Sequence, residues 1–146
     1  MRPNRVKAEG REKMRVLIVD DDWIVLESCR RVLQAEGMAV QAAEDAEKAQ
    51  SLLESGVGFD LILTDIKMPG RDGFELIRMA RERFPASAIL MMTGYLIPET
   101  IRRGEAQGAD AVIAKPFTPE ELVASVRRTM RTVRQRLPNG AAHRPD

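Results

Sequence analysis

The chain has 146 residues, which suffices for one compact domain with short tails but not for two hydrophobic cores. Its 23 Lys and Arg nearly balance its 22 Asp and Glu, so the net charge of +1 creates no overall field that would favour nucleic acid or an anionic membrane. The single cysteine, Cys29, cannot form an internal disulfide, and no apolar run reaches the roughly 18 residues that span a bilayer. We therefore expect a cytoplasmic protein with one domain.

The two ends of the chain are predicted to be flexible tails around one folded segment. Residues 1–13 include five Lys or Arg and one large aliphatic side chain, Val6, so they bury too little apolar surface to become ordered. Residues 138–146 begin with Pro-Asn-Gly, are short and polar, and are expected to be disordered. The predicted domain covers residues 14–137 with no output domain, and Met14 is an alternative to Met1 as the natural start.

The folded segment alternates short apolar runs with helical patterns, which is typical of βαβ units around a parallel sheet covered on both faces. Strands are predicted at residues 15–19, 39–43, 61–64, 88–92 and 111–114. The first helix carries the apolar stripe Val25, Cys29, Val32 and Leu33 and ends at Gly37, and the others lie at about 45–54, 73–83, 98–107 and 119–137. The sequence thus predicts one α/β domain of five βα units.

Chemically distinctive residues follow four of the five predicted strands. Asp20, Asp21 and Asp22 follow the first, and Asp65, Thr93 and Lys115 follow the third, fourth and fifth. Ligands of open parallel sheets bind outside the carboxyl ends of the strands. If the strand order is 2-1-3-4-5, the first and third strands are neighbours, and the first two aspartates lie beside the one after the third strand.

Several carboxylates in one pocket need a positive counter-charge. Two like charges 4 Å apart repel by about 1 kcal/mol in water and by about 4 kcal/mol at an effective dielectric near 20. The available ligands are all oxygens, which favours Mg²⁺ over zinc, and carboxylate-bound magnesium commonly also holds a phosphate. Asp65 is then the natural nucleophile, and Thr93 and Lys115 would bind phosphoryl oxygens.

Each of these residues also has an ordinary structural explanation. The Asp20 to Asp22 run can cap the first helix, and a lone Asp65 is as well suited to a turn as to chemistry. However, four separate strand ends each supply a residue type that a single phosphate and metal site requires. A chance combination of unrelated structural roles is therefore the weaker interpretation.

Four segments together resemble the receiver domains of bacterial two-component response regulators. They are VLIVDDD (residues 16–22), LTDIKMPGRDG (63–73), MTG (92–94) and KPF (115–117), and the match covers roughly residues 14–136. The resemblance implies a flavodoxin-like (βα)5 three-layer sandwich with a five-stranded parallel sheet in the order 2-1-3-4-5. It also implies a stand-alone, chemotaxis-regulator-like phosphoprotein.

The resemblance implies a role for each residue of the pocket. Asp65 would accept a phosphoryl group from the phosphohistidine of a sensor histidine kinase or a phosphotransfer protein. Asp21, Asp65 and the backbone carbonyl of Lys67 would ligate Mg²⁺, for which Mn²⁺ can substitute, and Asp20 would act mainly through a metal-bound water. The protein would be a switch with intrinsic phosphorylation and dephosphorylation chemistry, not an enzyme.

The resemblance also implies how the switch works. Thr93 would move toward the phosphoryl group, Lys115 would anchor it, and Pro116 would follow in a cis peptide bond. The result would be a population shift in the fourth and fifth βα units that controls a downstream protein. Val112 departs from the family pattern, because many receivers carry an aromatic residue three positions before the lysine, and the coupling of threonine to that ring is therefore in question.

Two positions are expected to set the lifetime of the phosphoryl group. In this family these positions lie two residues beyond the phosphoacceptor and two beyond the switch threonine, and here they are Lys67 and Tyr95. Two long side chains would screen the attacking water, so we expect a phosphoryl group that outlasts that of fast chemotaxis-type regulators.

Other functions compete with this interpretation. A phosphohydrolase like the haloacid dehalogenases would use Asp20 and Asp22, but Asp65 and the KPF segment would then lack a purpose. DNA binding would use the arginines of the last helix, for which a solvated helix face is the simpler explanation: Arg127, Arg128, Arg131, Arg134 and Arg136. We expect protein partners only, and the homodimers that the family forms through the fourth helix, fifth strand and fifth helix are a candidate assembly.

Overall fold

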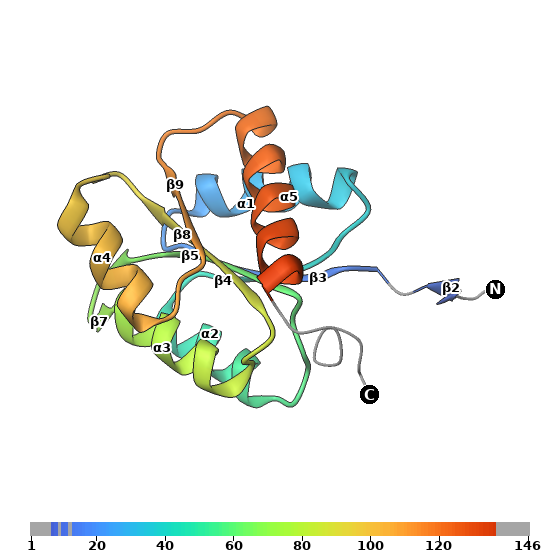
Figure 1. Ribbon diagram of the computed structural model, residues 1–146, viewed down its shortest axis with the longest axis horizontal. Helices are drawn as coiled ribbons and strands as arrows, with labels where there is room; N and C mark the ends of the chain where they lie inside the picture. The colour runs from blue at the N-terminus through green and yellow to red at the C-terminus, as the bar shows by residue number, and fades with distance from the viewer. Residues whose placement is uncertain (1–6, 9, 12, 137–146) are drawn as a thin grey trace.

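Five parallel strands form the central sheet in the computed structural model, which describes residues 7–8, 10–11 and 13–136 (Figure 1). In spatial order they are β4 (Ala39–Ala43), β3 (Arg15–Val19), β5 (Leu61–Asp65), β8 (Ala88–Thr93) and β9 (Ala111–Ala114). Counted along the chain this is the predicted order 2-1-3-4-5, and each neighbouring pair is parallel. The expected flavodoxin-like fold is confirmed.

Helices cover both faces of the sheet. Helices α1 (Trp23–Ala35) and α5 (Pro119–Arg136) lie on one face, and α2 (Ala46–Glu54), α3 (Gly73–Arg83) and α4 (Pro98–Gln107) lie on the other (Figure 1). No helix in the described part of the chain combines the length and the apolar composition that a membrane span requires.

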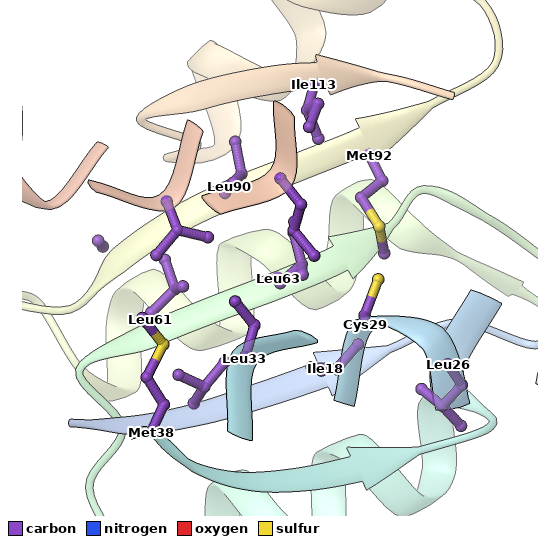
Figure 2. Close-up of a cluster of buried hydrophobic side chains, with 14 of the residues drawn as sticks. Ile18, Leu26, Cys29, Leu33, Met38, Leu61, Leu63, Leu90, Met92 and Ile113 are labelled. Atoms are coloured by element: carbon purple, nitrogen blue, oxygen red, sulfur yellow. The ribbon is translucent and has the colours of Figure 1, made fainter. Parts of the chain in front are cut away.

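Two apolar clusters hold the three layers together, because successive strand residues point to opposite faces. Val16 and Ile18 belong to the cluster under α1 and α5, and Leu17 and Val19 belong to the cluster under α2 and α3. Figure 2 shows the first cluster, in which side chains of α1 lie against Leu61 and Leu63 of β5. Every residue of β5 and β8 is buried, as expected for central strands covered on both faces.

Side-chain caps account for where several helices begin. Asp22, Asp45 and Asp72 are the N-caps of α1, α2 and α3, and each accepts a hydrogen bond from a backbone N–H of the first turn. Thr118 and Glu121 form a reciprocal capping box at the start of α5, with hydrogen bonds of 2.8 and 3.1 Å. Sequence and structure therefore agree closely on the helix starts.

The structure contains short elements that the sequence patterns did not indicate. Strands β6 (Lys67–Met68) and β7 (Arg71–Asp72) form a small antiparallel ladder directly after β5, with Gly70 at a φ of 78° in its turn. Strands β1 (Lys7–Ala8) and β2 (Gly10–Arg11) pair within the segment expected to be a flexible tail. The rest of that segment through residue 12, the predicted helix end at residue 137 and the tail at 138–146 lie outside the described residues.

Candidate functional site

The carboxyl ends of four neighbouring strands meet at one pocket. Asp20 follows β3, Asp65 ends β5, Thr93 ends β8 and Lys115 follows β9. The strand register aligns Asp65 with Met92, and Thr93 with the last residue of β9, so these ends lie side by side. The pocket has a volume of about 690 Å³.

Eight of the ten residues that the sequence assigned to the site or the switch line this pocket: Asp20, Asp21, Asp22, Asp65, Lys67, Thr93, Tyr95 and Lys115. The other two lie elsewhere. Pro116, joined to Lys115 by a cis peptide bond, lines a separate, mostly apolar pocket of about 470 Å³ between α1 and the start of α5. Val112 packs against the apolar cluster on the opposite face of the sheet.

Three carboxylates converge in the pocket. Asp20, Asp21 and Asp65 each offer an oxygen, and these oxygens lie within 4.8 Å of one another. Asp20 and Asp65 are buried, whereas Asp21 is exposed. At such distances their mutual repulsion amounts to several kcal/mol at an intermediate dielectric. The fold has brought these negative charges together against that repulsion.

One ammonium group faces the two buried carboxylates. Lys115 Nζ lies 2.6 Å from Asp20 Oδ2 and 3.1 Å from Asp65 Oδ2. Burial lowers the pKa of Lys115, but its close contacts with Asp20 and Asp65 and their negative charges outweigh burial, so its pKa lies above the ordinary value. The lysine is therefore charged, and a single positive charge is shared among three carboxylates.

Asp20 is the most constrained of the three carboxylates. Its Oδ1 accepts a hydrogen bond of 2.8 Å from the Asp22 N–H, whereas the short contact of its Oδ2 with Lys115 is not in hydrogen-bond geometry. Burial raises the pKa of Asp20, although Lys115 and the Asp22 N–H oppose this rise. The pocket thus contains a buried carboxylate oxygen whose one close polar partner among the described residues is the Lys115 ammonium.

The donor set of the pocket fits a hard divalent cation. The three converging side chains are carboxylates, neither histidine nor cysteine lines the pocket, and an ion held by the exposed Asp21 would keep access to water. A divalent ion would balance the negative charge that Lys115 leaves uncompensated. The Lys67 backbone lies beside this cluster, because its N–H donates a hydrogen bond of 3.2 Å to Asp65 Oδ1.

The Thr93 hydroxyl is engaged by its own loop. Its Oγ1 accepts a hydrogen bond of 2.9 Å from the Tyr95 N–H and donates one of 3.3 Å to the Tyr95 carbonyl. The side chain is buried at the pocket wall. The hydroxyl therefore has to exchange these partners before it can bind anything placed on Asp65.

Two cation–π contacts at the rim were not predicted from the sequence. Lys67 Nζ lies 4.4 Å from the centroid of the Tyr95 ring, and the guanidinium carbon of Arg103 lies 4.2 Å from the centroid of the Phe74 ring. All four residues line the pocket. From the sequence, Lys67 and Tyr95 were singled out only as separate positions, without a contact between them. No spacing pattern connected Arg103 with Phe74.

Comparisons with known proteins identify the family. Residues 16–127 match the family model of the response regulator receiver domain, so the chain belongs to this family of two-component signalling proteins. It is similar to the transcriptional regulatory protein ResD of Bacillus subtilis (strain 168), with 36% identity over 122 residues, which are 83% of this chain and 50% of that protein. The chain spans about half the length of the curated relatives it matches.

Solved receiver structures share the fold along nearly their whole length. The CheY-like response regulator receiver domain protein from Methanospirillum hungatei JF-1 superposes with a TM-score of 0.79 and 34% identity, covering 85% of this chain and 98% of that one. The chemotaxis response regulator CheY4 of Vibrio cholerae has a TM-score of 0.76 and 32% identity, covering 81% of this chain and 99% of that one. The part of this chain from β3 to α5 is thus a receiver domain.

Proposed function

We propose that the chain is a phosphorylation switch in which Asp65 receives a phosphoryl group from a phosphohistidine in a magnesium-dependent reaction. The donor would be a sensor histidine kinase or a phosphotransfer protein. The observation that carries the proposal is the convergence of Asp20, Asp21 and Asp65 around Lys115 at the carboxyl end of the sheet. This arrangement supplies a nucleophile, a set of metal ligands and a cation for the transferred group.

Asp65 is held at both oxygens in a way that suits a nucleophile. Oδ1 accepts a hydrogen bond from the Lys67 N–H, and Oδ2 accepts one from the Lys115 ammonium. These two bonds restrict rotation of the carboxylate group. In the transfer, a carboxylate oxygen forms a bond to phosphorus while the bond from phosphorus to the donor ring nitrogen breaks, and the ring keeps the electron pair and the proton on its other nitrogen. The product is an acyl phosphate on Asp65 and a neutral imidazole on the donor.

Other residues of the pocket would stabilise the transferred group. Lys115 already contacts Asp65 and would bind a phosphoryl oxygen, and Thr93 would leave Tyr95 to donate its hydroxyl hydrogen to another. Asp21 and Asp65, with the Lys67 carbonyl, would hold Mg²⁺, or Mn²⁺ in its place, and Asp20 would hold a water of that ion. The metal supplies positive charge that neutralises the phosphoryl oxygens during transfer.

The output is proposed to be a protein contact controlled by the segments after β8 and β9. Movement of Thr93 would displace the segment from Gly94 into α4, and this would shift the populations of the fourth and fifth βα units. The chain would therefore act as a switch rather than as an enzyme with turnover. A homodimer through α4, β9 and α5 is a further candidate output.

The phosphohydrolase alternative is not favoured by the site. That mechanism needs Asp20 and Asp22 as two available carboxylates, but Asp20 is fully buried and held by Lys115. Asp22 is occupied as the N-cap of α1 through its bonds to Ile24 and Val25. Asp65, unlike Asp22, belongs to the cluster of converging carboxylates and contacts Lys115.

Intact-mass analysis after incubation with phosphoramidate, with and without Mg²⁺, tests the proposal. The wild-type protein should gain one phosphoryl group only with Mg²⁺, and Asp65→Asn should gain none. Asp45→Asn is a matched control, because Asp45 caps α2 outside the pocket and asparagine is an equally good N-cap. A gain that persists in Asp65→Asn, or no gain in the wild type, would refute the proposed phosphoacceptor.

A further inference from the structure

Arg103 of α4 reaches across the rim of the pocket to the beginning of α3. Its Nη2 lies 3.2 Å from Asp72 Oδ2, and its guanidinium carbon lies 4.2 Å from the centroid of the Phe74 ring. Arg103 and Phe74 both line the pocket that contains Asp65. One arginine therefore contacts a carboxylate and an aromatic ring on the neighbouring helix, beside the candidate site.

The partners of Arg103 are connected rigidly to Asp65. Asp72 uses its other oxygen, Oδ1, to cap α3 through a hydrogen bond of 2.9 Å from the Phe74 N–H. Gly73 packs directly on the Ile66 backbone, where a Cβ would clash, and its N–H donates a hydrogen bond of 3.2 Å to the Ile66 carbonyl. Arg103 thus fixes α4 relative to the segment that begins at the phosphoacceptor.

Helix α4 has few other attachments. Gly104 is its one buried residue, and its N-cap residue, Ile97, provides no side-chain hydrogen bond to the first turn. At its far end Arg81 of α3 donates hydrogen bonds of 3.1 and 2.8 Å to the Gly108 carbonyl. An arginine therefore links α4 to α3 near each end of α3, and the link made by Arg103 is the one that lies at the pocket.

We propose that Arg103 is a positioning residue that holds α4 against the start of α3 in the unmodified protein and releases it when Asp65 carries a phosphoryl group. The group adds negative charge to the same pocket, and a planar guanidinium binds phosphate oxygens in a bidentate manner. The phosphoryl group therefore competes with Asp72 for the guanidinium of Arg103. The release rests on the proposed function, whereas the restraint in the unmodified protein does not.

Amide hydrogen exchange of peptides covering residues 98–107 tests the restraint without any phosphoryl chemistry. Arg103→Ala and Asp72→Asn should each speed exchange about three- to fivefold, the factor expected for loss of an exposed contact of this kind. Asp72→Asn is informative because asparagine keeps the cap of α3 and removes only the charge that Arg103 binds. Arg103→Lys keeps the charge without the planar stacking group and should fall between the wild type and Arg103→Ala.

Arg102→Ala is the matched control, since Arg102 is an exposed neighbour on α4 that makes no ion pair within the described residues. It should leave exchange of residues 98–107 within about 1.5-fold of the wild type. If residues 98–107 exchange no faster in Arg103→Ala and Asp72→Asn than in Arg102→Ala, the proposed restraint of α4 by Arg103 is wrong.

The same exchange measurement with phosphoramidate and Mg²⁺ tests the release, with intact mass recorded on the same samples. Wild-type α4 should then exchange about as fast as α4 in unmodified Arg103→Ala, and phosphorylated Arg103→Ala should show little further change. A phosphoryl gain without faster exchange in the wild type would overturn the release. Absence of any phosphoryl gain would instead refute the proposed function, while the result for the unmodified variants would still decide the restraint.

Discussion

Lys115 places its ammonium nitrogen 2.6 Å from Asp20 Oδ2, a carboxylate with no solvent exposure. The lysine side chain itself is 21% exposed, so the charge of Asp20 depends on this one cation when no metal is bound. Removing the cation leaves a buried carboxylate without a counter-ion, which is among the most destabilising changes known for ion pairs.

Lys115→Ala should therefore lower the free energy of unfolding in metal-free buffer by about 3 kcal/mol, measured by urea denaturation. The double variant Asp20→Asn with Lys115→Ala should recover most of this loss, because no buried charge remains. Lys48→Ala, a change at an exposed lysine on α2, is the control and should stay within about 0.5 kcal/mol of the wild type. A loss in Lys115→Ala no larger than in this control would contradict the proposed role of the ion pair.

Magnesium should stabilise the protein through Asp21. An ion that binds only the folded state at 100 times its dissociation constant raises stability by about 2.7 kcal/mol. Thermal melts in EDTA and in excess Mg²⁺ should show this increase for the wild type and for Asp45→Asn. Asp21→Asn should show little or none, yet should be at least as stable as the wild type in EDTA because one repelling charge is gone. An unchanged magnesium effect in Asp21→Asn would exclude Asp21 as a ligand.

The ends of the two central strands show where sequence patterns stop being informative. Strands β3, β4 and β9 begin and end where the apolar runs predicted, but β5 and β8 each extend one residue further, to Asp65 and Thr93. Both residues are polar and buried, so hydrophobicity alone ended these strands too early. Polar residues that interrupt a buried strand are common at functional sites.

The converging carboxylates could be predicted, whereas the contacts around them could not. Strand order alone brings Asp20 and Asp21 beside Asp65, because parallel strands end at one edge. The turn between β6 and β7 had a signal in the dipeptide Pro69-Gly70, which is typical of turns. The Arg103 contacts had none, because they join residues about 30 positions apart through the packing of two helices.

Cys29 should make stability depend on pH in the alkaline range. Burial, and secondarily the charge of Asp20, raises the pKa of the Cys29 thiol from 9.0 to about 12. The folded state therefore keeps its proton while the unfolded state loses it, so this stability is present below pH 9 and is lost as the pH rises toward 12. Between pH 7 and pH 10 the loss of stability from this thiol should be on the order of 1 kcal/mol.

Urea denaturation of the wild type and of Cys29→Ala at pH 7 and pH 10 measures the pH-dependent contribution of this thiol to the free energy of unfolding. The variant should be less stable at pH 7, because it leaves a small cavity under α1, but it should lose roughly 1 kcal/mol less than the wild type on going to pH 10. Native Cys29 should also react slowly with a thiol reagent at pH 9. Equal losses in the two proteins, or fast labelling of the native protein, would show that the thiol is not protected.

Arg81 should contribute strongly to stability through the loops that it joins. Besides its two bonds to the Gly108 carbonyl, it donates to the carbonyls of Pro85 and Ser87 and pairs with Asp110 Oδ2 at 2.7 Å. Arg81→Ala should lower the free energy of unfolding by about 3 kcal/mol, because the partly buried carbonyls of Gly108 and Ser87 lose a charged donor and Asp110 loses its ion pair. Arg81→Lys should restore little of this stability, since an ammonium cannot reach acceptors on two loops in the geometry of a guanidinium.

Arg78 on the same helix provides the comparison for Arg81. Its ion pairs with Glu75 and Glu82 are exposed, with distances of 3.9 and 3.3 Å, so Arg78→Ala should cost no more than about 0.5 kcal/mol in urea denaturation. Similar losses for the two arginines would mean that the bonds of Arg81 are not the source of its effect.

Lys67 and Tyr95 should determine how long a phosphoryl group survives on Asp65. Their cation–π contact lies over the pocket, with the ammonium 4.4 Å from the ring centroid, and it joins the segments that follow β5 and β8. Water must pass this rim to attack the acyl phosphate. We therefore expect decay over minutes or longer at neutral pH, measured by intact mass after removal of the phosphodonor.

Tyr95→Ala should shorten the lifetime about fivefold, the factor that corresponds to loss of a contact of about 1 kcal/mol. Lys67→Ala should act in the same direction, and the double variant should add little, because either single change already breaks the contact. Leu96→Ala is the control, since Leu96 is an equally exposed neighbour that does not line the pocket. Wild-type decay within seconds, or equal lifetimes in Tyr95→Ala and Leu96→Ala, would show that water reaches Asp65 by a path that these two side chains do not cover.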